Sequence, residues 1–519
     1  MRRNAPALLF GALAALFLLF FFAWPLLVIM QRSLGDTSSL LRILTDPWYL
    51  ERAGFTLMQA LLSTFLTLLV GLPGAVLFAR YDFPGRRLLR TAFTIPFVMP
   101  TVVAGMGFLA LVGPRGLSGV NLRDTLLIIL LAHVFYNCSL VIRIVGSYLE
   151  SVAPRLQEAA TTLGAGPWRT FVRVTLPVAR PAILAASALV FTLTFTSFGV
   201  IVLLAPSYGT LEVEIYRLTA RLLQLDAAAV LVLLQLVIVL AVTIAYTRAQ
   251  ARLAVSVTGS PAALVRPGPV AGLWLTLSLL PPGLLTLAPL VALLWQTLAT
   301  GAVQNFTFLL TATPTAAFPG AGRAIVNSLL IAGGSALVAL AVGFCFAYAV
   351  VRARLRWLDG TSLLPLATSA ITLGFGYLIA FPQLTVSPVG LVLAHSLIGF
   401  PFVARSILPA LRGIPPGLGA AASMLGASSW TVLRRVDLPL LVPALLSAAA
   451  FAFAISMGEF GASLVITRPE FATIPVAIFD RLGRPGAANY GSALALSVLL
   501  MAITAAVMLL LERRSKSEL

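Results

Sequence analysis

The sequence is a succession of long apolar runs separated by short segments rich in arginine, glycine and proline. Each run is about 20 residues long, the length that an α-helix needs to cross the hydrocarbon core of a bilayer. The runs lack the alternation of apolar and polar residues that marks barrel strands. We therefore predict an all-α polytopic membrane protein with about twelve transmembrane helices. The predicted spans are residues 8–30, 54–79, 91–112, 124–147, 182–204, 226–247, 272–297, 325–351, 361–381, 389–411, 443–467 and 489–511.

The amino-acid composition excludes an ordinary soluble protein. Hydrophobic residues make up 60% of the chain and charged residues only 10%, whereas soluble domains carry about 25% charged residues. A net charge of +18 can indicate a nucleic-acid partner. Here the arginines lie between apolar runs, which fits loops that face cytosol and anionic lipid, so no nucleic acid is expected. Cys138 and Cys345 fall inside apolar runs, so we expect neither a disulfide framework nor a metal site.

The distribution of basic residues predicts the orientation. If the N-terminus is cytosolic, about two thirds of the arginines and lysines lie in cytosolic segments, and cytosolic loops carry the excess of basic residues in membrane proteins. Twelve spans return the chain to the side on which it began. Both termini are therefore predicted to be cytosolic.

A polar, basic loop occurs twice. Its first copy is Glu158–Pro177, and its second copy, Ala420–Pro439, lies 262 positions later. At this spacing Gly164 aligns with Gly426, and the tryptophan and the proline that follow each glycine also align. Both copies lie between apolar runs and face the cytosol in the predicted orientation.

The repeat extends over most of the chain. Around the loops the spacing stays at 262, which aligns Ser197-Phe198-Gly199 with Glu459-Phe460-Gly461, and further upstream it becomes 269, as for Pro96 with Pro365. Because each half has an even number of spans, the halves are predicted to be parallel six-helix repeats. The segment that joins them is rich in glycine and proline. The predicted domains are a first repeat at 1–247 with its loop at 150–180, a cytosolic linker at 248–270, and a second repeat at 271–519 with its loop at 412–442.

Each loop is predicted to form two short helices around a turn. The residues before Gly164 favour a helix, Gly164 and Gly166 permit a turn, and the following segment is amphipathic, with Trp168 on its apolar face. An apolar tip flanked by charge suits a groove on a soluble partner. The alternative for one loop taken alone is a helix lying on the lipid surface, but two copies at matched positions favour a partner.

The loops carry a specific signature. The pattern Glu-Ala-Ala, three residues, Gly, nine residues, an aliphatic residue, one residue and Leu-Pro resembles the coupling loop of the permeases of binding-protein-dependent ABC importers. The first copy matches it fully, whereas Ala420 stands in the second copy where glutamate is expected, which leaves open what a salt bridge of that glutamate would do there. The resemblance implies that the following residues couple the chain to ATPase subunits: Glu158, Ala159, Ala160, Gly164, Trp168, Ala420, Ala421, Ala422, Gly426 and Trp430.

Twelve spans with two such loops are similar to the fused permeases for ferric iron and thiamine. This resemblance implies the transmembrane subunit of an importer in the bacterial plasma (inner) membrane. It also implies two ATP-binding subunits on the cytosolic face, which bind ATP and Mg, and a periplasmic or extracellular substrate-binding protein. A phosphate-binding loop needs glycines followed by a lysine, and the one lysine, Lys516, lies in the C-terminal tail without them. We therefore expect no catalytic residue, no cofactor and no enzyme activity in this chain.

Three stretches are similar to thiamine permeases. They are residues 131–137, residues 210–216, and residues 456–461 followed by Thr473-Ile474-Pro475. Ferric-iron permeases share the last of these loosely. The expected cargo is thiamine or a derivative, with ferric iron as the alternative.

Polar residues inside the predicted spans are candidates for a substrate path because they are costly in lipid. Glu459 can attract the cationic ring of thiamine, and the alternative is that it pairs with an arginine or caps a broken helix outside the path. His133, His395 and Asn137 are further candidates, although for the histidines a structural hydrogen bond is the favoured interpretation. Ser197, which aligns with Glu459, completes this set.

Two acidic residues within the second thiamine-like stretch, Glu212 and Glu214, are predicted to lie outside the membrane and to be solvated, with a contact to the binding protein as the alternative. Two rival classes of function remain. An ion-coupled secondary transporter needs carboxylates or broken-helix ion sites inside the membrane, and in that scheme the two loops have no role. An intramembrane hydrolase needs a serine paired with a histidine, and no serine motif is spaced to pair with His133 or His395.

Overall fold

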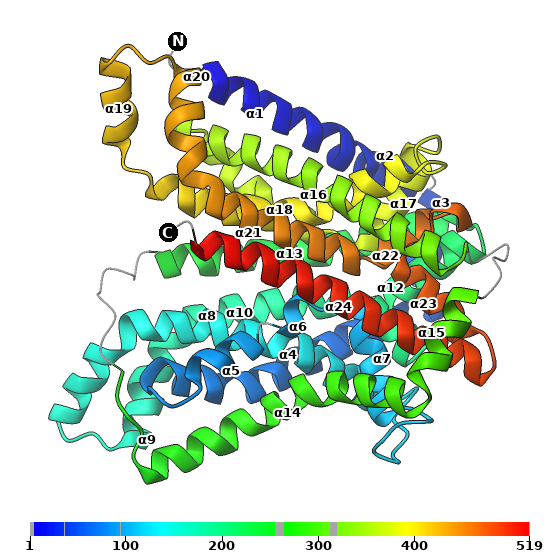
Figure 1. Cartoon of the computed structure of the whole chain (residues 1–519), viewed down its shortest axis with the longest axis horizontal. Helices are drawn as coiled ribbons and strands as arrows, with labels where there is room; N and C mark the ends of the chain where they lie inside the picture. Colours follow the sequence, from blue (N-terminus) through cyan, green and yellow to red (C-terminus); the bar gives the residue numbers. More distant parts are fainter. Residues whose placement is uncertain (1–4, 36, 94, 255–263, 312–318, 518–519) are drawn as a thin grey trace.

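The computed structural model describes residues 5–35, 37–93, 95–254, 264–311 and 319–517, and within these ranges the chain is built from helices (Figure 1). The elements of the first half are α1 (Ala5–Leu18), η2 (Leu19–Ala23), α2 (Trp24–Leu34), α3 (Thr37–Thr45), α4 (Pro47–Arg80), α5 (Arg86–Ala92), α6 (Ile95–Val98), α7 (Thr101–Val112), α8 (Leu126–Thr162), α9 (Pro167–Thr170), η3 (Phe171–Thr175), α10 (Leu176–Phe195), α11 (Gly199–Leu204), α12 (Leu211–Tyr216), η4 (Arg217–Arg221) and α13 (Leu225–Ala254). Those of the second half are α14 (Pro269–Ala299), α15 (Ala302–Thr311), α16 (Ala321–Arg352), η5 (Arg356–Ala367), α17 (Ala370–Ala380), α18 (Pro388–Gly413), α19 (Pro416–Met424), α20 (Ser429–Val432), η6 (Leu433–Asp437), α21 (Leu438–Gly458), α22 (Gly461–Ile466), η7 (Pro469–Phe471), α23 (Ile474–Gly483) and α24 (Ala487–Ser517).

The all-α polytopic fold predicted from the sequence is confirmed. Ten helices of the described residues are long and apolar enough to cross a membrane. Their outward faces carry many exposed large apolar side chains, such as Leu13, Phe65 and Leu337. A water-soluble surface does not present apolar residues in such density, whereas a lipid-facing one does.

The third predicted span of each half is broken rather than continuous. Residues 91–112 contain the end of α5, the single turn α6 and the short helix α7, and residues 361–381 contain most of η5 followed by α17. Prolines cause both breaks, because a proline lacks the backbone N–H and moves the preceding residue away from helical geometry. Pro100 directly precedes α7, and Pro365 lies in η5.

The fifth and eleventh predicted spans, 182–204 and 443–467, also end earlier than predicted. Helix α10 stops at Phe195 and α21 stops at Gly458, and after a short break the chain resumes as α11 and α22. The two breaks contain the aligned triplets Ser197-Phe198-Gly199 and Glu459-Phe460-Gly461. The repeat in the sequence is therefore also a repeat of backbone interruptions.

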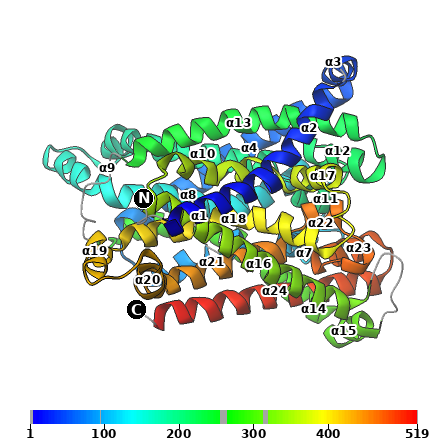
Figure 2. The ribbon, with the colours of Figure 1, turned by 90° about the horizontal axis from the view of Figure 1, so that it is seen from above.

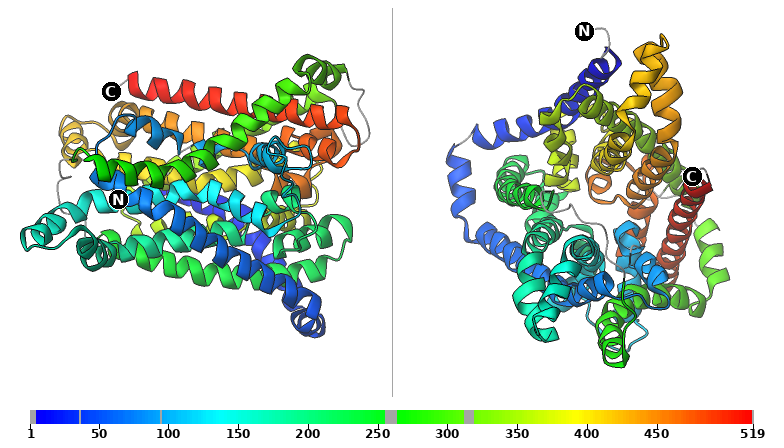
Figure 3. Two further views of the ribbon diagram at one scale, coloured as in Figure 1. Left: turned by 90° about the horizontal axis from the view of Figure 1, so that it is seen from below. Right: turned by 90° about the vertical axis from the view of Figure 1, so that its left-hand side faces the viewer.

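The first span of each half packs on the other half. Helices α1 and α2 lie along α16 and α17, and α14 lies along α7 and α4. In the right-hand view of Figure 3, dark-blue α1 lies beside yellow-green helices, and green α14 lies beside blue and cyan ones. Both contacts place a proline on a glycine. A Cβ atom added to Gly107 would lie 2.7 Å from the carbonyl oxygen of Pro289, and one added to Gly376 would lie 3.0 Å from Cβ of Pro25.

A second pair of close contacts holds each half together. Helix α4 packs against α8 and α16 packs against α18. A Cβ atom added to Gly71 would lie 2.9 Å from Val141, and one added to Gly343 would lie 2.5 Å from Val403. The two valines are 262 positions apart, so equivalent glycines allow equivalent helices to approach closely in both halves.

The two loops and both ends of the described chain lie at one end of the helical bundle (Figures 1 and 2). Helices α9, α19 and α20 project there, and α3, α12, α15 and α23 gather at the opposite end. The predicted linker lies partly outside the described residues, which omit 255–263. Its last part returns at Val265, which forms an isolated β-bridge with Tyr81 just after α4.

Candidate functional site

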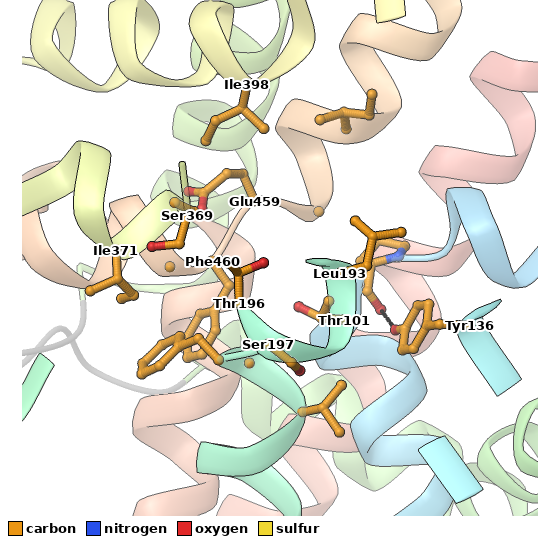
Figure 4. Close-up of a pocket in the computed structure, with 18 of the residues that line it drawn as sticks. Thr101, Tyr136, Leu193, Thr196, Ser197, Ser369, Ile371, Ile398, Glu459 and Phe460 are labelled. Carbon is orange, nitrogen blue, oxygen red and sulfur yellow. Dashed lines mark hydrogen bonds between the residues drawn. The ribbon is translucent and has the colours of Figure 1, made fainter. Parts of the chain in front are cut away.

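A cavity of about 350 Å³ lies between the two halves. Thr101, Tyr136 and Thr196 line it from the first half, and Ser369 and Glu459 line it from the second (Figure 4). The backbone interruptions described above form much of its wall, because a broken helix brings polar side chains and free backbone groups to a surface inside the bundle. A cavity with a few polar groups on apolar walls is the usual form of a small-molecule site.

Glu459 lines this cavity, and its own surroundings satisfy both of its carboxylate oxygens. Oε1 accepts a hydrogen bond from the backbone N–H of Ala462 at 2.9 Å, and Oε2 accepts from the backbone N–H of Ser463 at 3.0 Å. Oε2 also lies 3.0 Å from Nε2 of His395 and accepts from the Ser463 hydroxyl at 3.0 Å. The residue therefore caps α22 and pairs with a histidine, while it also faces the cavity.

His395 lies behind Glu459 and outside the cavity lining. Its Nδ1 is 2.8 Å from the Ser456 hydroxyl and its Nε2 is 2.9 Å from the Ser463 hydroxyl. The aligned His133 does line the cavity. Its Nδ1 is 2.8 Å from the Ser63 hydroxyl, whereas its Nε2 has no hydrogen-bond partner among the described residues. The two aligned histidines thus differ in their surroundings.

The remaining sequence candidates, Asn137 and Ser197, also line the cavity. The amide of Asn137 donates to the backbone carbonyl of His133 at 2.8 Å. Next to Ser197, Phe198 stacks on its aligned counterpart Phe460, with ring centroids 5.8 Å apart. Because equivalent residues touch there, the stack lies close to the approximate two-fold axis that relates the halves. The structure therefore brings four of the five candidates to one cavity, and the fifth, His395, contacts Glu459 from behind the cavity wall.

The prediction that Glu212 and Glu214 are solvated is wrong, because both are buried. Helix α12, which carries them, packs on α4, α13 and α17. Glu214 pairs with Arg217 at 2.7 Å, and Glu212 accepts a hydrogen bond from Gln235 at 2.6 Å and lines the cavity. The sequence places these acidic residues outside the apolar runs, and nothing local in it reveals that the chain folds back between the halves.

The paired loops, residues 150–180 and 412–442, share a common backbone. Gly164 and Gly426 both adopt the left-handed conformation, with φ of +78° and +85°, which only glycine adopts without strain. In the first loop α8 runs unbroken to Thr162, whereas in the second Ile414 and Pro415 separate α18 from α19. A π-helical turn follows each glycine at aligned positions, as η3 and η6.

The tips of the paired loops are apolar and exposed. Leu163 and Leu425, which directly precede the two glycines, are 87% and 89% exposed, and Trp168 is 74% exposed. Trp430 is less exposed, at 42%, and packs edge-on against Phe10 of α1 at a centroid distance of 5.8 Å. Leu163 and Leu425 are not among the coupling residues predicted from the sequence, although their position directly before each glycine marks them. Of the predicted coupling residues, Ala159, Ala420 and Ala421 are exposed, Ala160 and Ala422 are partly buried, and the side chain of Glu158 lies outside the described part of the structure.

Ion pairs tie each loop to its own half, with the charges exchanged. Glu150, near the first loop, contacts Arg86 at 2.8 Å and Arg90 at 3.3 Å. Its aligned residue in the second half is Arg412, which contacts Asp359 at 2.7 Å. Arg90 and Asp359 are 269 positions apart, the spacing of that region of the repeat. In the second loop, buried Asp437 also pairs with Arg352 and accepts a hydrogen bond from the Tyr348 hydroxyl.

Comparison with known proteins places the chain in a family. Residues 71–256 and 356–517 match the family described as binding-protein-dependent transport system inner membrane component. The chain is 28% identical to the thiamine transport system permease protein ThiP of Salmonella typhimurium over 485 residues, which cover 88% of this chain and 87% of that protein. It is also 28% identical to ThiP of Escherichia coli over 467 residues, 84% of each chain.

A third relative is shorter. The chain is 32% identical to the sulfate transport system permease protein CysT of Escherichia coli over 210 residues, which cover 39% of this chain and 76% of that protein. The two matched regions of the chain each contain one of the paired loops and most of the helices of one half. This chain belongs to the family of binding-protein-dependent transport system inner membrane components.

Proposed function

We propose that this protein is the permease subunit of an ABC importer that carries thiamine or a close derivative across the bacterial plasma membrane. The observation that carries the proposal is the similarity to two thiamine permeases along 84–88% of the chain. The cavity between the halves supports it, because its wall combines the carboxylate of Glu459 with aromatic and hydroxyl side chains. A cationic ring with polar substituents suits such a wall.

Energy enters through partner subunits in this proposal. Two cytosolic ATPase subunits bind ATP and Mg, and one docks on each of the paired loops. The exposed Leu163 and Leu425 support this arrangement, since apolar tips that project from one end of a membrane protein suit grooves on soluble partners. The loops and both chain ends then lie in the cytosol, and a substrate-binding protein delivers the cargo at the opposite end.

Movement of the halves against each other exposes the cavity to one side of the membrane at a time. The approximate two-fold relation supports this mechanism, because parallel repeats move as bodies around a site at their interface. The Phe198–Phe460 stack and the cavity lie at that interface. Helices α1 and α2 pack on the second half, and α14 packs on the first half. These contacts keep the two halves together during the movement.

The test is uptake of radiolabelled thiamine into proteoliposomes that contain this chain with its ATPase subunits and binding protein. We expect uptake that requires ATP inside and the binding protein outside. Ferric iron is run in parallel. Uptake of iron alone contradicts the proposed cargo but keeps the importer, whereas thiamine uptake that needs no ATP contradicts the transporter class and favours an ion-coupled carrier.

A further inference from the structure

Two carboxylates line the cavity, and they differ in how well the protein satisfies them. Backbone N–H groups, a serine hydroxyl and His395 occupy both oxygens of Glu459. Glu212 is 0% exposed. Its Oε1 accepts a hydrogen bond from Gln235, whereas its Oε2 has no hydrogen-bond partner among the described residues. The carboxylate with spare hydrogen-bonding capacity is therefore Glu212.

An unpaired buried carboxylate oxygen is costly. A buried acceptor without a donor destabilises the fold, and more so when it is charged, so an unsatisfied group that faces a cavity calls for an explanation. The Ser369 hydroxyl lies beside the Glu212 carboxylate, near enough to interact with it, although no hydrogen bond of standard geometry reaches Oε2 in the described part of the chain. Its oxygen accepts from the backbone N–H of Thr372 at 2.9 Å, and its hydroxyl proton can be donated to a carboxylate or to a bound molecule.

The two groups come from different halves of the molecule. Glu212 lies on α12 of the first half, and Ser369 caps α17 of the second half. Both line the cavity, and Figure 4 shows Ser369 beside Glu459 on its wall. Together they present an acceptor and a donor next to each other. A flat ring that carries an N–H donor beside an acceptor nitrogen is complementary to this pair.

We propose that Glu212 contacts the transported molecule and accepts a hydrogen bond from its exocyclic amine, while the Ser369 hydroxyl donates to the adjacent ring nitrogen. The chemical class recognised is an aminopyrimidine or a ring with the same edge. The inference rests on the proposed function, because the aminopyrimidine ring of thiamine has this edge. It goes beyond it by assigning the recognition to Glu212 and Ser369 rather than to Glu459.

The decisive variant is Glu212→Gln. The glutamine oxygen still accepts from Gln235, and its amide nitrogen then stands where Oε2 stood, so an acceptor becomes a donor at unchanged size. The matched control is Glu51→Gln, the same substitution at a carboxylate that is 70% exposed and outside the cavity lining. Both variants are reconstituted with the same ATPase subunits and the same binding protein, so differences between them arise in this chain.

The measurement is the KM for uptake of thiamine and of oxythiamine, in which an oxo group replaces the exocyclic amine and the donor–acceptor order is reversed. We expect Glu212→Gln to raise the KM for thiamine about tenfold or more, because the amide nitrogen of glutamine cannot accept the hydrogen bond of the exocyclic amine and two donors then face each other. The KM for oxythiamine should rise much less or fall. Glu51→Gln should leave both values unchanged.

The outcomes separate the two proposals. If the unmodified chain does not take up thiamine, the proposed cargo and this assignment both fail. If it does, and Glu212→Gln keeps the same KM values and the same preference for thiamine over oxythiamine, only the Glu212 assignment fails. If Glu212→Gln does not fold, as judged by gel filtration, Glu212→Asp replaces it. The shorter aspartate keeps the carboxylate but moves its oxygens away from the cavity. An unchanged preference between thiamine and oxythiamine in this variant overturns the assignment.

Discussion

At the scale of single residues, the two halves use aligned positions differently. Ser197 and Glu459 occupy equivalent backbone interruptions, yet only the second carries a charge. Glu459 compensates for its burial by capping α22 and by contacting His395. Buried charges persist where hydrogen bonds and a partner replace water. Glu459 thus caps a broken helix and also faces the cavity, and its contact with a cationic substrate stays a prediction.

The cap leads to a prediction for Glu459→Gln. The glutamine retains one acceptor oxygen, and its amide nitrogen then faces the donors that Oε2 now serves. We expect the free energy of unfolding to fall by about 1.5–3 kcal/mol and uptake of a cationic substrate to slow. Thermal unfolding of the purified chain and the uptake rate are the measurements. Ser197→Ala at the aligned position is the control, and equal melting temperatures for the two variants would contradict the capping role.

At the scale of elements, the paired loops preserve their turn although their sequences and flanking helices differ. One loop follows an unbroken helix and the other follows a separate short helix, yet both turn at a left-handed glycine and continue through a π-helical turn. The two turns are therefore specified locally, by the position of one glycine in each loop.

Replacing both turn glycines by valine tests the role of the loops. A left-handed conformation costs a residue with a Cβ atom about 1–2 kcal/mol, and no atom lies within 4 Å of a Cβ at Gly164 or Gly426, so no clash adds to it. We expect the double variant to fold in the membrane and its complex to hydrolyse ATP without coupled uptake. Gly166→Val is the matched control, because Gly166 lies in the same open loop without a positive φ. Normal uptake by the double variant would exclude a coupling role.

At the scale of the whole molecule, the first span of each half connects the halves, because it packs on the opposite half. The contacts of Gly107 with Pro289 and of Gly376 with Pro25 are reciprocal, because each joins the first span of one half to the third segment of the other. Ridges of side chains cannot approach this closely unless one helix offers a glycine. The two halves are thus repeats in the sequence, and in the structure each half packs its first span against the other half.

Valine at Gly107 or Gly376 should weaken the contacts between the first span of one half and the third segment of the other. We expect Gly107→Val and Gly376→Val each to lower stability by about 1–3 kcal/mol, the usual cost of overpacking, and the double variant to show roughly the sum, since the sites are distant. The measurement is the thermal unfolding midpoint in detergent. Gly283→Val in α14 is the control, because a Cβ there meets no atom within 4 Å. If all three single variants melt alike, the glycine contacts do not hold the halves together.

The sequence by itself determined the membrane environment, the all-α class, the parallel repeat and the position of the paired loops. These properties follow from hydropathy, spacing and turn residues, which act over a few neighbouring positions. From the sequence, residues 91–112 and 361–381 are predicted as continuous spans, whereas the structure breaks both. A membrane helix often tolerates proline, and the neighbouring helices decide whether the helix continues through it.

Only the tertiary structure decided which polar residues meet. Three features depend on segments from distant parts of the chain. They are the burial of Glu212, the contact of His395 with Glu459, and the packing of the first span of each half on the other half. A carboxylate outside the apolar runs is expected in water unless the fold brings a second half over it, and no local pattern in the sequence records that covering. The physical reason is that burial and pairing depend on side chains supplied from elsewhere in the fold, whereas helix formation in a membrane depends on the segment itself.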